Sequence, residues 1–92
     1  MSSGADGVHV RVTFGARALV AANDGLDRAA SAREYARLLA AALAAEWPGA
    51  TIEVEPTDDA APTRAAAPSP AMERMALDLA WTVRQCAPWA VR

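Results

Sequence analysis

Hydrophobic and polar side chains alternate along two short stretches of this sequence. In residues 8–14 the hydrophobic positions are Val8, Val10, Val12 and Phe14, and the polar positions are His9, Arg11 and Thr13. In residues 50–55 they are Ala50, Ile52 and Val54 against Thr51, Glu53 and Glu55. Because successive side chains of a strand point to opposite faces of a sheet, the alternation predicts two strands, each with one buried face and one face in water.

A helical period of hydrophobic residues follows in residues 31–49. The residues of its predicted buried stripe are Tyr35, Leu38, Leu39, Ala42, Leu43 and Trp47. Ser31 and Glu34 have the spacing of a capping box, which predicts that the helix begins at about Ala32. Pro48 and Gly49 end it, because proline cannot donate the next backbone hydrogen bond and glycine accepts a left-handed turn. We expect this helix to serve mainly as scaffold.

The other stretches are less regular. Residues 18–22 predict a second strand, which forms a hairpin with the first. Residues 56–70 contain four prolines and no large apolar side chain, which predicts a linker or mobile loop. Ser69 followed by Pro70 is typical of a helix start, and a second helix is expected to continue to about Gln85.

Together these elements predict a single small α+β domain over residues 8–92, in the order strand, strand, helix, strand, loop, helix. The expected sheet has three strands and is mostly antiparallel, with the strand of residues 8–14 in the middle, antiparallel to both neighbours. The strand of residues 50–55 would then be parallel to that of residues 18–22 through a helical crossover, with both helices on one face. Residues 1–7 are small and polar and predict a disordered N-terminus.

Composition narrows the classes of partner. Of the 92 residues, 53% are hydrophobic, but many of these are alanine, so the core is thin and a dimer or a bound partner becomes more plausible. The nine basic residues are all arginine, scattered along the chain against eleven acids for a net charge of −2, which argues against nucleic-acid binding. The sequence contains no membrane span and no signal-peptide pattern, so a cytoplasmic protein is expected.

The second predicted helix has two apolar sides. One stripe contains Met72, Met75, Ala76, Leu79, Val83 and Cys86, and the opposite side contains Arg74, Leu77, Asp78, Trp81 and Gln85. A tryptophan among charged residues on an outer helix face is typical of a binding hot spot. Two alternatives remain open at this point: a rotated helix with Trp81 in the core and the methionines outside, or a C-terminal tail in which Trp89 and Val91 fold back over Trp81.

The residues that carry chemistry do not form a catalytic or cofactor motif. His9 and Cys86 are the sole histidine and cysteine, too few for a structural zinc site, and Cys86 is expected to be a small buried hydrophobe. Asp58 and Asp59 are interpreted as a solvated acidic pair. Glu53 and Glu55 project from one face of their strand, where Arg11 could pair with them.

The sequence therefore favours a small non-enzymatic protein-interaction module without a metal or cofactor, such as an adaptor, an inhibitor or a regulatory accessory protein of bacterial or phage type. We expect it to bind a protein partner, or a second copy as a homodimer, through Arg74, Leu77, Asp78, Trp81, Gln85 and Trp89. The alternative is a small-ligand-binding or enzymatic domain that uses the polar face of the sheet, with His9, Arg11, Glu53 and Glu55. A pocket that gathers these four residues would favour the alternative, and a flat solvated sheet would count against it. A nucleic-acid module, the third hypothesis, predicts salt-sensitive binding to DNA or RNA.

Overall fold

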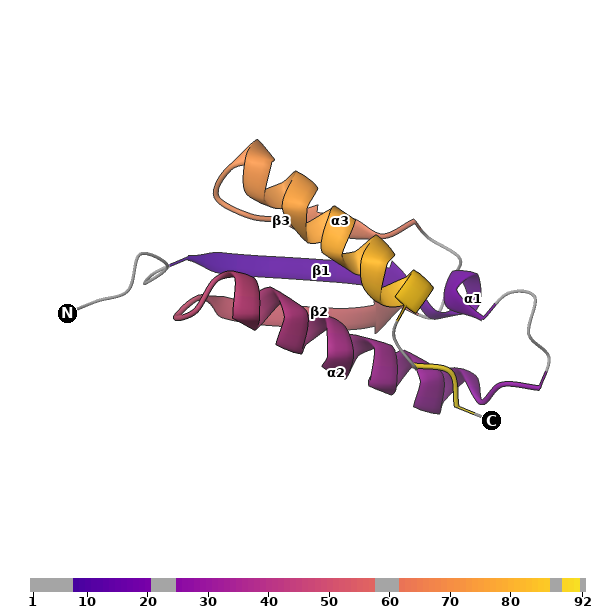
Figure 1. Ribbon diagram of the computed structural model, residues 1–92. Helices are drawn as coiled ribbons and strands as arrows, with labels where there is room; N and C mark the ends of the chain where they lie inside the picture. The colour runs from indigo at the N-terminus through magenta and orange to yellow at the C-terminus, as the bar shows by residue number, and fades with distance from the viewer. Residues whose placement is uncertain (1–7, 21–24, 58–61, 87–88, 92) are drawn as a thin grey trace.

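The computed structural model describes residues 8–20, 25–57, 62–86 and 89–91, and it has the expected α+β class (Figure 1). Its elements are β1 (His9–Gly15), α1 (Ala16–Leu19), α2 (Arg28–Glu46), β2 (Thr51–Thr57), β3 (Arg64–Ala66) and α3 (Pro70–Cys86). The predicted disorder of residues 1–7, the last two residues of the predicted second strand, and Asp58 and Asp59 lie outside the described residues.

The three strands form one mixed sheet in the order β2-β1-β3. The strand β1 is central, as predicted, and it is antiparallel to β3, with Val12 opposite Ala65. It is parallel to β2, however, with Val12 opposite Val54, so the prediction of a mostly antiparallel sheet is wrong. The helical crossover joins β1 to β2 through α2, because a parallel neighbour needs a long return connection.

The predicted strand at residues 18–22 is the origin of this error. Residues Ala16–Leu19 form the short helix α1, in keeping with the high helix propensity and low strand propensity of alanine. The third strand comes instead from the predicted loop: Arg64–Ala66 pairs with the free edge of β1. That pairing is a tertiary contact, which the proline-rich composition of residues 56–70 does not indicate.

The helix α2 begins one turn earlier than the predicted start at Ala32. The side chain of Asp27 accepts a hydrogen bond from the backbone N–H of Ala30 at 3.0 Å and caps the helix. Ser31 lies inside the helix and is fully buried, so the predicted capping box with Glu34 is wrong. Glu34 accepts two hydrogen bonds from the Arg37 guanidinium, which lower the pKa of its carboxyl.

The end of α2 agrees with the prediction. The helix stops at Glu46, and Gly49 has a φ of 89°, a left-handed conformation that favours glycine. The strand β2 continues through Pro56 to Thr57, two residues beyond its predicted end.

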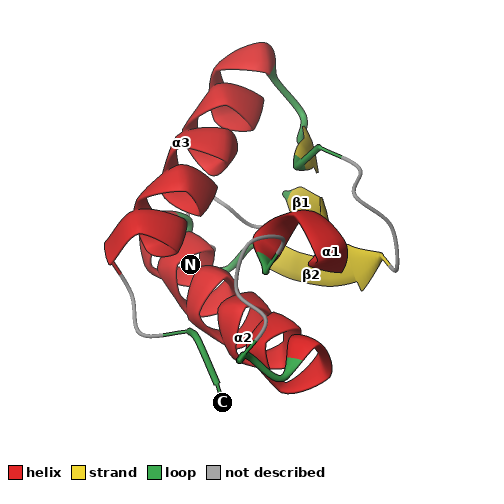
Figure 2. Ribbon diagram, turned by 90° about the vertical axis from the view of Figure 1, so that its right-hand side faces the viewer, coloured by secondary structure: helices red, strands yellow, loops and turns green. Residues whose placement is uncertain are grey.

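Both long helices pack on the same face of the sheet, as predicted, and the core lies between the two layers (Figure 2). The residues buried there come from β1, α1 with its C-cap, α2, α3 and the tail: Val10, Val12, Phe14, Ala16, Leu19, Val20, Ala32, Tyr35, Leu39, Leu43, Ala76, Ala80, Val83 and Trp89. We call the opposite side of the sheet, with the side chains of His9 and Arg11, the open face.

The C-terminal tail is tied to the start of α2. The backbone N–H of Val91 donates to Ser31 Oγ at 2.9 Å, and Ser31 Oγ donates to the Val91 carbonyl at 3.1 Å. The same carbonyl accepts the N–H of Asp27 at 2.7 Å. In the part of the chain that the structure describes, no helix is both long and apolar enough to cross a membrane.

Candidate functional site

The outer face of α3 presents five side chains of the predicted interaction site together. Ser69 caps this helix, since its Oγ accepts the N–H of Met72 at 3.2 Å, and Pro70 is its first residue, as predicted. The residues of the outer face follow one another at helical spacing and are all exposed: Arg74, Leu77, Asp78, Trp81 and Gln85. Trp81 is 63% exposed and Leu77 39% exposed. A large aromatic ring therefore lies in water at the centre of a mixed polar and apolar surface.

The inner side of α3 fixes this rotation. Ala76, Ala80 and Val83 are buried against the rest of the fold. The alternative with Trp81 in the core is therefore wrong. Of the methionine stripe, Met72 is half-buried and Met75 is 41% exposed, and the side chain of Cys86 lies outside the described residues.

A small hollow lies beside Trp81. Its volume is about 90 Å³, and its walls are Tyr35, Thr63, Leu77, Ala80, Trp81 and Arg84. Arg84 donates a hydrogen bond to the Ala18 carbonyl at 2.9 Å, so its guanidinium is held between α3 and α1. The hollow therefore opens next to the tryptophan ring.

Trp89, the sixth predicted interaction residue, lies elsewhere. It is buried, its ring centroid lies 6.1 Å from that of Tyr35, and its Nε1 donates to the Arg84 carbonyl at 3.0 Å. The tail therefore fills the core near Tyr35 and leaves Trp81 exposed. The structure does not bring Trp89 onto the outer face of α3, and the alternative of a tail folded over Trp81 is wrong.

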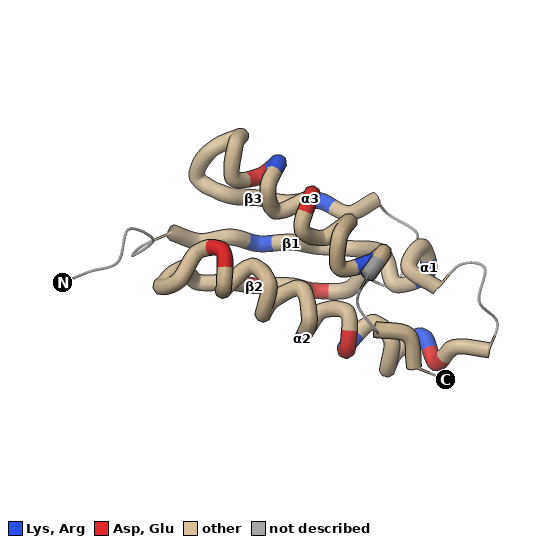
Figure 3. Tube along the Cα trace, viewed as in Figure 1, with Lys and Arg blue, Asp and Glu red and all other residues tan. Residues whose placement is uncertain are grey.

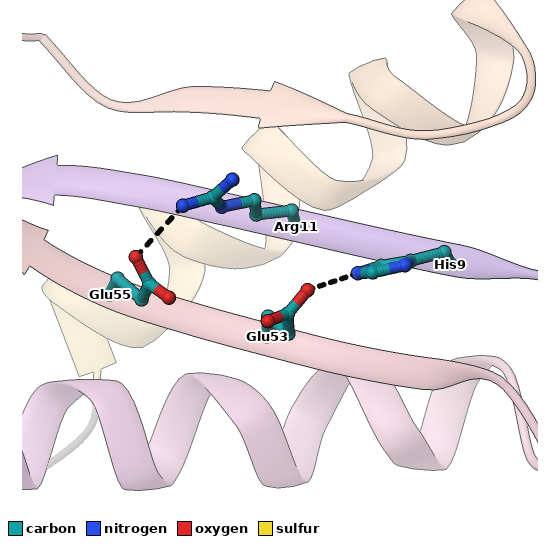
Figure 4. Close-up of polar contacts among 4 residues, drawn as sticks. All are labelled: His9, Arg11, Glu53 and Glu55. Atoms are coloured by element: carbon teal, nitrogen blue, oxygen red, sulfur yellow. Dashed lines mark hydrogen bonds and ion pairs between the residues drawn. The ribbon is translucent and has the colours of Figure 1, made fainter.

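The four residues of the alternative site lie together on the open face as two cross-strand side-chain pairs (Figure 4). His9 Nε2 contacts Glu53 Oε2, and Arg11 donates to Glu55 at 3.0 Å. All four side chains are well exposed to solvent. The hydrogen bond and charge of Glu55 raise the pKa of Arg11. Glu53 and Glu55 thus each use one carboxylate oxygen toward β1 on an open sheet surface.

Sequence reasoning missed a groove between α2 and the free edge of β2. It has a volume of about 620 Å³ and is lined by Arg33, Ala36, Arg37, Ala40, Ile52, Glu53, Val54, Glu55 and Pro56. Glu53 and Glu55 therefore border both the open face and this groove. The signal that could have indicated it is Pro56, because a proline within a strand is typical of a sheet edge.

Charge is mixed over the described chain, with acidic and basic positions near one another on α2 and α3 (Figure 3). Among the described residues, no three histidine, cysteine, aspartate or glutamate side chains gather in a way that could hold a metal ion.

No protein-family model, curated protein or solved structure matches the chain.

Proposed function

We propose that this chain is a small non-enzymatic protein-interaction module whose outer face of α3 binds a protein partner. The observation that carries the proposal is the 63% exposure of Trp81 on a helix whose other side is already packed in the core. The exposed ring of Trp81 leaves apolar surface in contact with water, which is unfavourable for the free protein. A partner that covers the ring removes this surface from water, and that burial favours binding.

The surroundings of Trp81 support this interpretation. Leu77 adds apolar area one turn before it, while Arg74 and Asp78 provide one charge of each sign. A large apolar anchor bordered by polar groups is the composition of an interface centre and its rim. The hollow beside Trp81 adds the concave element into which a partner's own side chain fits.

The test compares three proteins: wild type, Trp81→Ala and the matched control Met75→Ala. Met75 is also an exposed apolar residue of α3, about 120° around the helix from Trp81. Each protein is immobilised and used to capture partners from the source cell, and each is examined alone by light scattering. We expect wild type and Met75→Ala to bind the same protein partner, or a second copy of the chain. Trp81→Ala should lose this binding.

The size of the loss is part of the proposal. A hot-spot tryptophan contributes about 2 kcal/mol or more to binding, so Trp81→Ala should weaken a measured partner affinity by about 30-fold or more. If wild type and Trp81→Ala retain the same proteins and have the same oligomeric state, the outer face of α3 is not the binding surface.

A further inference from the structure

We propose a second binding site, independent of the outer face of α3: the free edge of β2 binds an extended peptide segment that alternates cationic and small apolar residues. The incoming segment adds a fourth strand to the sheet beside β2, over the groove that α2 borders. Backbone hydrogen bonds would hold the segment, and the two faces of β2 would select its side chains.

The backbone of β2 has hydrogen-bonding groups directed at this edge. The N–H of Thr51 donates to the Val8 carbonyl at 2.8 Å, so the backbone of Thr51 is directed at β1. In a parallel ladder, alternate residues direct their groups to the same side. Ile52, Val54 and Pro56 therefore direct theirs away from β1, and no described strand lies beyond β2. Pro56 lacks an N–H and stands where none is needed for the sheet.

On the open face, the charge of the edge specifies cations. Glu53 and Glu55 project there from β2, and each uses one carboxylate oxygen, Oε2, toward the neighbouring strand β1. Residues directly opposite on a new strand would have Cβ atoms within about 5.5 Å, so basic side chains there would meet two acids. On the other side of β1, the strand β3 carries Arg64, which lies opposite Thr13 of β1. The acidic side of the open face is therefore the β2 side.

On the other face, the groove specifies small apolar residues. Ile52 and Val54 are only half-buried there, and Ala36 and Ala40 of α2 form a low wall beside them. Arg33 and Arg37 border the same groove, and they would repel cations placed on this side. The preferred segment therefore has basic side chains toward the open face and small apolar side chains toward α2.

A second copy of β2 fits this edge less well. Consider two antiparallel copies of β2 with Val54 on the axis between them, so that Ile52, Val54 and Pro56, the residues directed at the edge, face one another. Glu53 of each copy then lies opposite Glu55 of the other. Like charges directly opposite one another destabilise a strand pair. The acids and Pro56 thus act against indiscriminate pairing of edges while leaving the edge open to a cationic strand.

The experiment uses a peptide with the seven-residue length of β2, alternating lysine and valine, added to the full chain. Amide hydrogen exchange is followed by NMR. At a peptide concentration about ten times the Kd, exchange at Ile52 and Val54 should slow by about tenfold, because each bound peptide covers these groups. The amides of Thr51 and Glu53, which are directed at β1, provide the internal control and should change little.

Two control peptides and two double variants isolate the backbone and charge contributions. A peptide N-methylated at the positions that face β2 keeps its side chains but should lose binding, and an alternating glutamate-valine peptide should not bind. Glu53→Gln with Glu55→Gln should weaken binding of the lysine peptide by about three- to tenfold, since exposed charge pairs contribute up to about 1 kcal/mol each. The matched control, Glu46→Gln with Glu73→Gln, removes the same charge outside the groove and should bind nearly as wild type does.

Each other result overturns the proposal. Unchanged exchange at Ile52 and Val54, equal binding of the N-methylated peptide, or equal binding of the acidic peptide would show that the edge does not take a cationic strand. Protection of Ile52 and Val54 that rises with protein concentration in the absence of peptide would identify a second copy as the occupant. Circular dichroism of both double variants establishes that each is folded.

Discussion

Tyr35 connects four parts of the core through one side chain. Its ring lies edge-on to Phe14 of β1, with centroids 4.7 Å apart, and edge-on to Trp89 of the tail. Its hydroxyl donates to the Ala80 carbonyl of α3 at 2.8 Å. Because Tyr35 itself belongs to α2, both long helices, the central strand and the tail meet at this residue.

Burial of Tyr35 has a consequence at alkaline pH. Desolvation raises the pKa of its hydroxyl above the ordinary value of about 10, an effect that the charge of Arg84 partly offsets. The folded state thus holds the proton more tightly than the unfolded state. The associated stability is fully present below the unfolded pKa and is lost as pH rises through the folded pKa.

We therefore expect the free energy of unfolding, measured in urea, to fall as the pH is raised above about 10. In Tyr35→Phe this part of the pH dependence should be absent, although that variant is less stable by about 1 kcal/mol because it lacks the hydrogen bond to Ala80. The same alkaline slope in wild type and Tyr35→Phe would contradict the assignment.

Ser31 offers a second test at this scale. Its side chain is fully buried and joins α2 to Val91, so Ser31→Ala removes the hydrogen bond that the Val91 N–H donates and one of the two that the Val91 carbonyl accepts. We expect a loss of about 1–3 kcal/mol in the free energy of unfolding. Glu34→Ala, which removes only an exposed ion pair, should cost less than about 1 kcal/mol. Equal losses would contradict the role of Ser31 in joining α2 to the tail.

The regular elements could be predicted from the sequence, and the irregular ones could not. The alternation in residues 8–14 and the Ser69-Pro70 start identified β1 and α3, because those signals are local. The pairing of β3, at Arg64–Ala66, depends on contact with β1, more than fifty residues away in the chain, and its own composition is that of a loop. Helical spacing placed Trp81 opposite the methionine stripe but left its exposure open, and both that exposure and the burial of Trp89 needed the fold.

The start of α2 shows how two similar local signals compete. Both Asp27 and Ser31 are good capping residues, and only the structure shows that Asp27 is used, which leaves Ser31 for the tail. Asp27→Ala should therefore lower the free energy of unfolding by about 0.5–2 kcal/mol. Chemical denaturation measures this loss, and an unchanged stability would show that the helix does not depend on this cap.

The whole molecule is a two-layer fold whose helices cover one face of a small mixed sheet. Its core is built around the fully buried side chains of Leu39 and Leu43 and the valines of β1. This arrangement leaves the outer face of α3 exposed, and no described strand lies beyond β2 at its end of the sheet. The partner proposed for α3 and the peptide proposed for β2 would therefore contact different elements.

The buried and exposed apolar residues should respond differently to truncation. Leu39→Ala removes a side chain with no exposure and should lower the free energy of unfolding by about 2–5 kcal/mol. Met75→Ala, at an exposed position, should change it by less than about 1 kcal/mol. Urea titration of both variants checks this contrast, and comparable losses would contradict the burial of Leu39 in the core and the exposure of Met75.

The most direct test of the proposed function measures stability and binding on the same Trp81→Ala protein. We expect its free energy of unfolding to stay within about 1 kcal/mol of wild type, since the ring is mostly exposed, while the affinity for the captured partner falls by about 30-fold or more. A loss of stability of about 3–5 kcal/mol, the cost of truncating a core tryptophan, or an unchanged partner affinity would contradict the account.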